Sequence, residues 1–164
     1  MLGADNQQER PVLSLDFLAG LIVGEGSYHL AIVIQRKTGY VEVRPQFSMR
    51  MNDLETVDQV IESFHAHGLA LYCTPGLYQS CRQVVCYGQK KMRPHLDTFL
   101  PLLTGKKLQA AAILDEFLAL RADHHKGYDE RDIALIERLR GINGPSARRL
   151  DIGILRDHTR RIAG

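Results

Sequence analysis

The sequence lacks the features that mark disulfide-bonded, membrane-spanning and secreted proteins. Its three cysteines are an odd number without CxxC spacing, so neither a disulfide framework nor a zinc knuckle is expected. No apolar stretch has the length of a membrane span. The N-terminal segment MLGADNQQER has no charged-then-apolar signal layout. We therefore expect an intracellular protein, of the cytoplasm or an organelle, that is not secreted and binds no membrane.

Charged residues are unevenly distributed, although the formal net charge is only +2. Residues 74–94 contain Arg82, Lys90, Lys91 and Arg93 and no acid, while acidic side chains concentrate in residues 53–62. A protein with one basic side can present that side to phosphates. Ordinary solvated charge would give the same total, so charge alone does not decide between the two interpretations.

Hydrophobic periodicity predicts an α+β protein in which helices pack on antiparallel hairpins. The chain has 164 residues, of which 45% are apolar, enough for one domain with a core. We place that domain at residues 13–164, C-terminal helices included, behind a polar tail of residues 1–12. The expected elements are a helix over 15–25 capped by Ser14 and closed by Gly26, strands around a turn at 37–39, a helix capped by Asn52 or Asp53 and ended by Gly68, strands over 69–74 and 80–88 around Pro75-Gly76, and helices at about 90–103, 105–122, 130–141 and 145–160.

The segment 41–50 alternates between apolar and polar residues, which predicts a strand with one buried face and one wet face. Val41, Val43, Phe47 and Met49 share the apolar parity. Pro45 lies on the same parity and cannot donate to a strand ladder, so an edge position or a bulge is expected there.

The segment LAGLIVGEGS, residues 18–27, combines an apolar helix, two glycines four residues apart and an acid at the C-terminal end. Glycines at this spacing allow helix backbones to approach closely. A carboxylate at a helix C-terminus is electrostatically unfavourable because the macrodipole is negative there, and Mg²⁺ would offset it. A buried helix with a surface glutamate at a frayed end would show the same pattern, so both interpretations stay open at this point.

The same ten residues resemble the motif that names the LAGLIDADG homing endonucleases. Val23 replaces the first acid of the motif and Glu25 the second, while the matching residues are Leu18, Ala19, Gly20, Leu21, Ile22, Gly24 and Gly26. Residues 45–64 and 101–110 are similar to two further segments of the family, and the element order extends the resemblance over about residues 13–120. The resemblance implies the αββαββα fold of that family, here with extra C-terminal helices, whose antiparallel sheet forms a DNA-binding saddle.

The activity that the resemblance implies is site-specific double-strand DNA cleavage by metal-dependent phosphodiester hydrolysis. Such enzymes are homing endonucleases, often intron-encoded, with long and roughly palindromic targets. Glu25 and the main-chain carbonyl of Gly24 would bind Mg²⁺ or Mn²⁺, without a small-molecule cofactor. Lys106 would border the active site, with Lys107 able to substitute. Met51 stands where some members carry a water-positioning glutamine, so the polar groups that would have to serve instead are Asn52, Arg50 or Gln46.

A single motif supplies one Glu25, whereas a duplex has two strands to cut, so we expect a C₂ homodimer. The expected dimer interface is formed by Leu18, Gly20, Leu21 and Gly24.

DNA is expected on the polar face of the hairpins, because a two-stranded ribbon fits the major groove. Arg44 and Arg50 could pair with guanine, Gln35 or Gln46 with adenine, and Glu42 with cytosine. The facing of the second hairpin is ambiguous from sequence. The expected DNA contacts are Ser27, His29, Gln35, Lys37, Glu42, Arg44, Gln46, Ser48 and Arg50, with Gln79, Arg82 and Gln83 as candidates on the second hairpin.

Two alternative functions stay open. One keeps the fold without cleavage, as an RNA maturase that assists splicing or a DNA-binding regulator, and Met51 argues mildly for it. The other is a small α+β interaction protein unrelated to nucleic acid. The arginine-bearing polar parity of residues 42–50 weighs against the second alternative, since interaction surfaces are more often aromatic or aliphatic.

Overall fold

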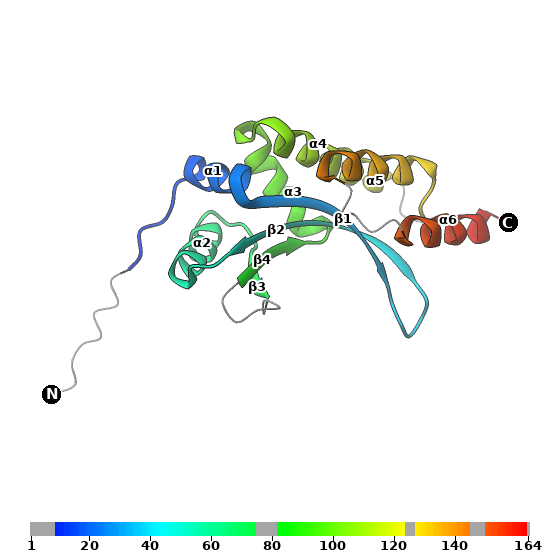
Figure 1. Cartoon of the computed structure of the whole chain (residues 1–164), viewed down its shortest axis with the longest axis horizontal. Helices are drawn as coiled ribbons and strands as arrows, with labels where there is room; N and C mark the ends of the chain where they lie inside the picture. Colours follow the sequence, from blue (N-terminus) through cyan, green and yellow to red (C-terminus); the bar gives the residue numbers. More distant parts are fainter. Residues whose placement is uncertain (1–8, 75–81, 124–126, 145–149, 164) are drawn as a thin grey trace.

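The computed structural model describes residues 9–74, 82–123, 127–144 and 150–163 (Figure 1). Its element order confirms the predicted αββαββα arrangement with additional C-terminal helices. The elements are α1 (Leu15–Glu25), β1 (Gly26–Ile34), β2 (Val41–Met51), α2 (Leu54–Ala66), β3 (Tyr72–Thr74), β4 (Arg82–Tyr87), α3 (Gln89–Phe99), the 3₁₀ turn η1 (Leu100–Leu102), α4 (Gly105–Asp123), α5 (Glu130–Asn143) and α6 (Leu150–Ala163).

The ends of the first two helices follow the capping chemistry of the sequence. The Ser14 hydroxyl accepts a hydrogen bond from the main-chain N–H of Phe17 at 3.2 Å. Asp53, rather than Asn52, caps α2, and its carboxylate accepts from the N–H of Glu55 at 3.3 Å. These side chains satisfy main-chain donors that a helix leaves unpaired at its N-terminus.

The later elements differ from the prediction mainly at their ends. The helix expected over 90–103 ends at Phe99 and continues as a 3₁₀ turn. The helix expected over 145–160 is described over Leu150–Ala163, and residues 145–149 lie outside the described part of the chain. Pro75 and Gly76, the expected second turn, also lie outside it.

The four strands form one antiparallel sheet in the order β1-β2-β4-β3. In β2 the apolar parity is buried and the polar parity is more accessible, as the alternation predicts, except that Ser48 is also buried. Pro45 is buried in this interior strand, at the point where pairing with β4 ends. β4 pairs with residues 46–51, and the N–H of Gly88, just after β4, donates to the Pro45 carbonyl at 3.0 Å. Pro45 cannot return that bond, and β4 does not pair with residues 41–44, so Pro45 lies at the boundary of a local edge rather than on an edge strand or at a bulge.

Gly26 marks the junction between α1 and β1. Its backbone is ordinarily extended, with φ −76°. A Cβ at this position would lie 2.6 Å from the Ile22 carbonyl oxygen and 2.8 Å from Cε2 of Phe47. Close packing, rather than a left-handed conformation, therefore demands glycine here.

The core between the sheet and the helices contains a buried histidine. His95 lies on the same stripe of α3 as Met92, Leu96 and Phe99, and all four are fully buried. The His95 Nε2 atom lies 3.0 Å from the Tyr28 hydroxyl. Burial lowers the pKa of His95 to about 3, so its ring is neutral at ordinary pH.

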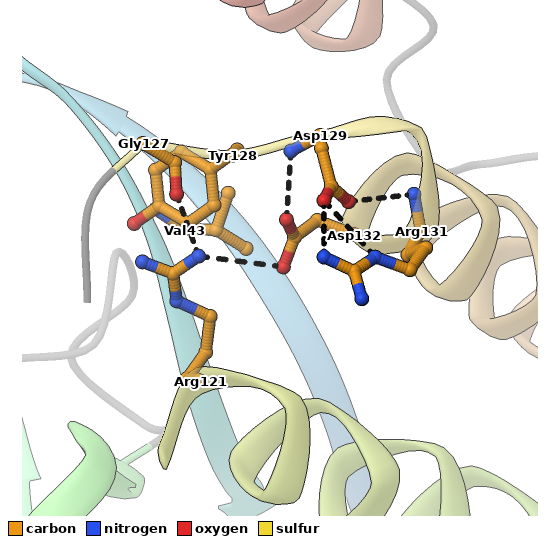
Figure 2. Close-up of polar contacts among 7 residues, drawn as sticks. All are labelled: Val43, Arg121, Gly127, Tyr128, Asp129, Arg131 and Asp132. Carbon is orange, nitrogen blue, oxygen red and sulfur yellow. Dashed lines mark hydrogen bonds and ion pairs between the residues drawn. The ribbon is translucent and has the colours of Figure 1, made fainter. Parts of the chain in front are cut away.

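A polar cluster at the start of α5 connects the C-terminal helices to the sheet (Figure 2). Arg121 donates to the Gly127 carbonyl at 2.6 Å, lies 3.7 Å from an Asp132 carboxylate oxygen, and stacks over Tyr128 at 4.5 Å. The Tyr128 hydroxyl accepts from the N–H of Val43 at 2.7 Å. This hydroxyl therefore satisfies a main-chain donor on the part of β2 that β4 leaves unpaired.

Side chains of the helical layer also cover the free edge of β1. Lys107 of α4 donates to the Gly26 carbonyl, and Asn143 of α5 donates to the Tyr28 carbonyl at 2.8 Å. Such contacts occupy groups that would otherwise be open to another strand. None of the described helices has the length and apolar character needed to span a bilayer.

Candidate nucleic-acid interface and cleavage site

The first helix divides its residues between the core and the surface. Leu18, Ala19 and Ile22 are buried, whereas Gly20 and Gly24 are exposed, and a Cβ at either glycine would meet nothing within 4 Å in this chain. The expectation that Leu18 lies in a dimer interface is wrong, because it is fully buried in the chain's own core.

Phe17 was missed by the sequence analysis and is 53% exposed on the glycine face of α1. Its spacing of three and seven residues from Gly20 and Gly24 is the signal that could have identified it. Leu21, another expected interface residue, is half-buried.

Glu25 is the last residue of α1 and is exposed where the helix meets the sheet. The last turn of α1 contains no basic side chain, so nothing on the helix itself offsets this charge at the negative end of the macrodipole. Among the described residues, no three His, Cys, Asp or Glu side chains group as a metal site. An exposed carboxylate beside a helix C-terminus suits a hard divalent cation, but one chain supplies only part of a ligand set.

Lys107 is the lysine that the structure brings to this junction. Its ammonium group donates to the carbonyl of Gly26, the residue after Glu25, whereas Lys106 is exposed. His29 is half-buried beside it, with Nε2 3.4 Å from the Ser48 hydroxyl. Burial, and then the charge of Lys107, lower the pKa of His29, which favours its neutral form.

Met51 packs against the core and supplies no polar group to the junction. Of the substitutes named from the sequence, Arg50 and Asn52 are exposed and Gln46 is half-buried.

The outer face of the sheet, opposite the helix-covered face, carries the polar parity of both long strands. Cross-strand partners there are Ser27 with Ser48, His29 with Gln46, Ala31 with Arg44, and Val33 with Glu42. The predicted facing of these strands is confirmed, and the β1–β2 hairpin extends away from the helical layer (Figure 1). A ribbon of this kind presents a row of side chains to a groove.

At the tip of the hairpin, Gln35 and Lys37 are both exposed. The Gln35 carbonyl accepts from the N–H of Gly39 at 2.8 Å, and its side-chain oxygen accepts from Thr38 at 3.3 Å. Gln35 therefore helps to form the turn as well as lying at the tip.

The second hairpin adds Gln83 to the outer face, where it pairs with Arg50. Arg82 has the opposite parity and shares the helix-covered face with Val84 and Cys86, which are fully buried. Of the candidates on this hairpin, Arg82 therefore does not share the outer face with Gln83, because side chains alternate along a strand. Gln79 lies outside the described residues.

Two tyrosines that the sequence analysis missed form a cation-rich patch on the outer face. Tyr72 and Tyr87 are 41% and 40% exposed, and the Lys91 ammonium lies 4.4 Å and 5.6 Å from their ring centroids. Arg44 stacks over Tyr87 at 5.1 Å. The hydrogen bond to Tyr72 raises the pKa of Lys91, so the patch stays positively charged.

The chain is similar to known proteins in structure rather than in sequence. No family model and no curated protein matches the chain. The homing endonuclease I-CvuI, described in complex with DNA targets, has a TM-score of 0.74 at 13% identity, covering 92% of this chain and 94% of the other. The archaeal intron-encoded homing endonuclease I-Vdi141I, complexed with DNA, has a TM-score of 0.72 at 18% identity, covering 92% and 97%.

The homing endonuclease I-TnaI has a TM-score of 0.68 at 16% identity, covering 90% of this chain and 98% of the other. The LAGLIDADG homing endonuclease I-SmaMI, bound to cleaved DNA, has a TM-score of 0.62 at 21% identity, and here the match spans 78% of this chain but 43% of the other. I-CvuI, I-Vdi141I and I-TnaI match this chain over nearly their whole length, whereas I-SmaMI matches over less than half of its length. The chain therefore has the fold of the single-domain LAGLIDADG homing endonucleases.

Proposed function

We propose that the chain is a site-specific, divalent-metal-dependent DNA endonuclease that acts as a homodimer, with residues 13–164 as one domain. The observation that carries the proposal is the position of Glu25. Its exposed carboxylate lies at the end of a helix whose glycine face is open, and directly before the strand that starts the polar sheet face.

In this proposal the residues around Glu25 hold the reacting phosphate. Glu25 and the Gly24 carbonyl would bind Mg²⁺ or Mn²⁺, which supplies charge neutralisation and activates water in phosphodiester hydrolysis. Lys107 adds a fixed positive charge beside the same junction, with Lys106 as the second candidate. The outer face from Ser27 to Arg50 would lie in the major groove.

The dimer follows from the exposed face of α1. Gly20 and Gly24 leave room for a second backbone, and Phe17 and Leu21 add apolar surface beside them. A two-fold pair of these helices would bring two Glu25 residues together, one for each DNA strand. Two close carboxylates repel each other, and a shared divalent cation would remove that repulsion.

Met51 favours a second candidate, a DNA-binding protein or RNA maturase of the same fold that does not cut, because no polar group replaces it at that position. The experiment that separates the candidates incubates the purified protein with a randomised duplex library, with and without Mg²⁺. Metal-dependent double-strand cleavage of a subset of duplexes is expected. Binding without cleavage under any divalent metal would support the second candidate instead.

A further inference from the structure

Glu42, Arg44 and Tyr87 form one unit on the outer face of the sheet. Arg44 donates from Nη2 to a Glu42 oxygen at 3.0 Å and from Nε to the other oxygen at 3.5 Å. The guanidinium carbon lies 5.1 Å from the centre of the Tyr87 ring. The carboxylate and the ring therefore restrict the guanidinium from two directions.

The guanidinium of Arg44 is planar and has five N–H groups, so the groups that Glu42 engages determine which donors remain free. Glu42 engages the Nε hydrogen and one Nη2 hydrogen, and within the described residues Arg44 has no further hydrogen-bond or ion-pair partner. The remaining hydrogens include one on Nη1 and one on Nη2 that point together from the end of the side chain. This parallel pair matches the O6 and N7 acceptors of guanine in the major groove.

Local charge favours a base edge over a phosphate as the partner of Arg44. Glu42 offsets the positive charge of the guanidinium at 3.0 Å, and a phosphate would be repelled by the same carboxylate. Ala31 is the cross-strand neighbour of Arg44 on β1, so the side chain directly opposite Arg44 on that strand is small. Glu42, in turn, is engaged by Arg44 rather than open to the amino group of a cytosine.

We propose that Arg44 determines specificity by pairing with one guanine in each half of the DNA target, and that Glu42 and Tyr87 are positioning residues for it. The proposal rests on the DNA binding put forward above and does not depend on cleavage. In place of the separate base contacts expected of Arg44 and Glu42, the proposal has one preorganised unit, completed by Tyr87, whose members act at the same base position.

The test selects duplexes from a randomised pool with the intact protein in Ca²⁺, and then measures affinity for every base at each position of the selected target. Wild-type protein is expected to prefer guanine at one position in each half by roughly 5- to 150-fold. Arg44→Lys keeps the positive charge but removes the parallel pair of N–H donors. The preference for guanine should therefore be lost at that position, while the preferences at the other positions of the target are kept. Arg50→Lys is the matched control, because Arg50 is exposed on the same strand and parity. It should leave that position unchanged.

The positioning residues give the second arm of the test. Glu42→Gln and Tyr87→Ala are expected to weaken the preference at the Arg44 position alone. A change at a different, cytosine-containing position in Glu42→Gln would show that Glu42 contacts a base itself and would overturn the unit. Unchanged preferences in Arg44→Lys, with DNA still bound, would overturn this inference and leave the proposed function intact. Absence of any selected duplex for wild-type protein would overturn both.

Discussion

Lys107 donates a hydrogen bond to the main-chain carbonyl of Gly26, the residue immediately after Glu25. The bond ties α4 to the junction of α1 and β1, and it fixes a positive charge beside the exposed carboxylate. Lys106 precedes it on α4 but is exposed. Neighbouring residues on a helix differ in direction by about 100°, so only one of the two lysines can face the junction.

Replacing Lys107 should therefore reduce DNA cleavage more than replacing Lys106. In Lys107→Met we expect the single-turnover cleavage rate to fall by about 10²- to 10³-fold, the range for loss of one group that stabilises transition-state charge. Lys106→Met is the matched control and should fall much less. DNA affinity measured in Ca²⁺ reports binding separately, and a larger loss in the Lys106 variant would contradict the assignment.

Alanine at the glycines of α1 should weaken dimerisation without harming the fold of one chain. A Cβ at Gly20 or Gly24 meets nothing within 4 Å in this chain, and alanine favours helix by about 1 kcal/mol over glycine. In a close helix pair the added methyl would cost about 1–3 kcal/mol of association through overpacking. Sedimentation equilibrium measures that loss.

Gly141→Ala, on α5 and equally free of neighbours within 4 Å, is the control for helix propensity alone. It should leave association unchanged. A wild-type protein that stays monomeric at micromolar concentration would contradict the paired-helix site.

His95 should make the free energy of unfolding depend on pH. Its folded pKa is about 3, below the ordinary value of 6.5, so the unfolded chain binds the extra proton between these values. The contribution is fully present above about pH 6.5 and is lost as pH falls towards 3, at up to about 1.4 kcal/mol per pH unit.

Urea unfolding of two variants isolates this effect. Tyr28→Phe removes the partner hydroxyl and keeps His95, whereas Tyr28→Phe with His95→Phe removes both polar groups. The single variant should keep the pH dependence of the unfolding free energy. In the double variant the number of protons taken up on unfolding should fall by about one. Equal slopes in the two proteins would show that His95 does not titrate as its burial requires.

Removal of the Arg121 guanidinium should destabilise the fold strongly. Arg121 and Asp132 are 7% and 2% exposed, so Arg121→Met leaves a buried carboxylate without its cation. The expected loss is about 3–5 kcal/mol of unfolding free energy. Arg138→Met breaks an exposed ion pair with Glu116 and should cost about 1 kcal/mol or less. Similar losses in both variants would contradict the role of the buried cluster in Figure 2.

The sequence predicts those parts of the fold and site that depend on local periodicity. The alternation in residues 41–50 is long enough to fix the facing of β2, and antiparallel pairing then fixes β1. β3 has only three residues, too few to show a period, and the facing of Arg82 and Gln83 on its partner strand could not be decided. The stripe of Met92, His95, Leu96 and Phe99 did carry a signal for the buried histidine.

Other features depend on how elements dock and could not be predicted. The choice between Lys106 and Lys107 depends on the rotation of α4 against β1. Leu18 matches the motif as well as Gly20 does, but the side of α1 that meets the core is set by packing. Tyr87 joins Arg44 across two strands, a contact that depends on where β4 ends.

The most direct test of the proposed nuclease compares Glu25→Gln with wild-type protein on one selected duplex in Mg²⁺. Glutamine keeps the size of the side chain and removes the negative charge that would bind the cation, while the exposed position should leave folding unaffected. We predict that the variant binds the duplex with affinity close to wild type and makes no double-strand cut. Full cleavage by Glu25→Gln would contradict the central claim.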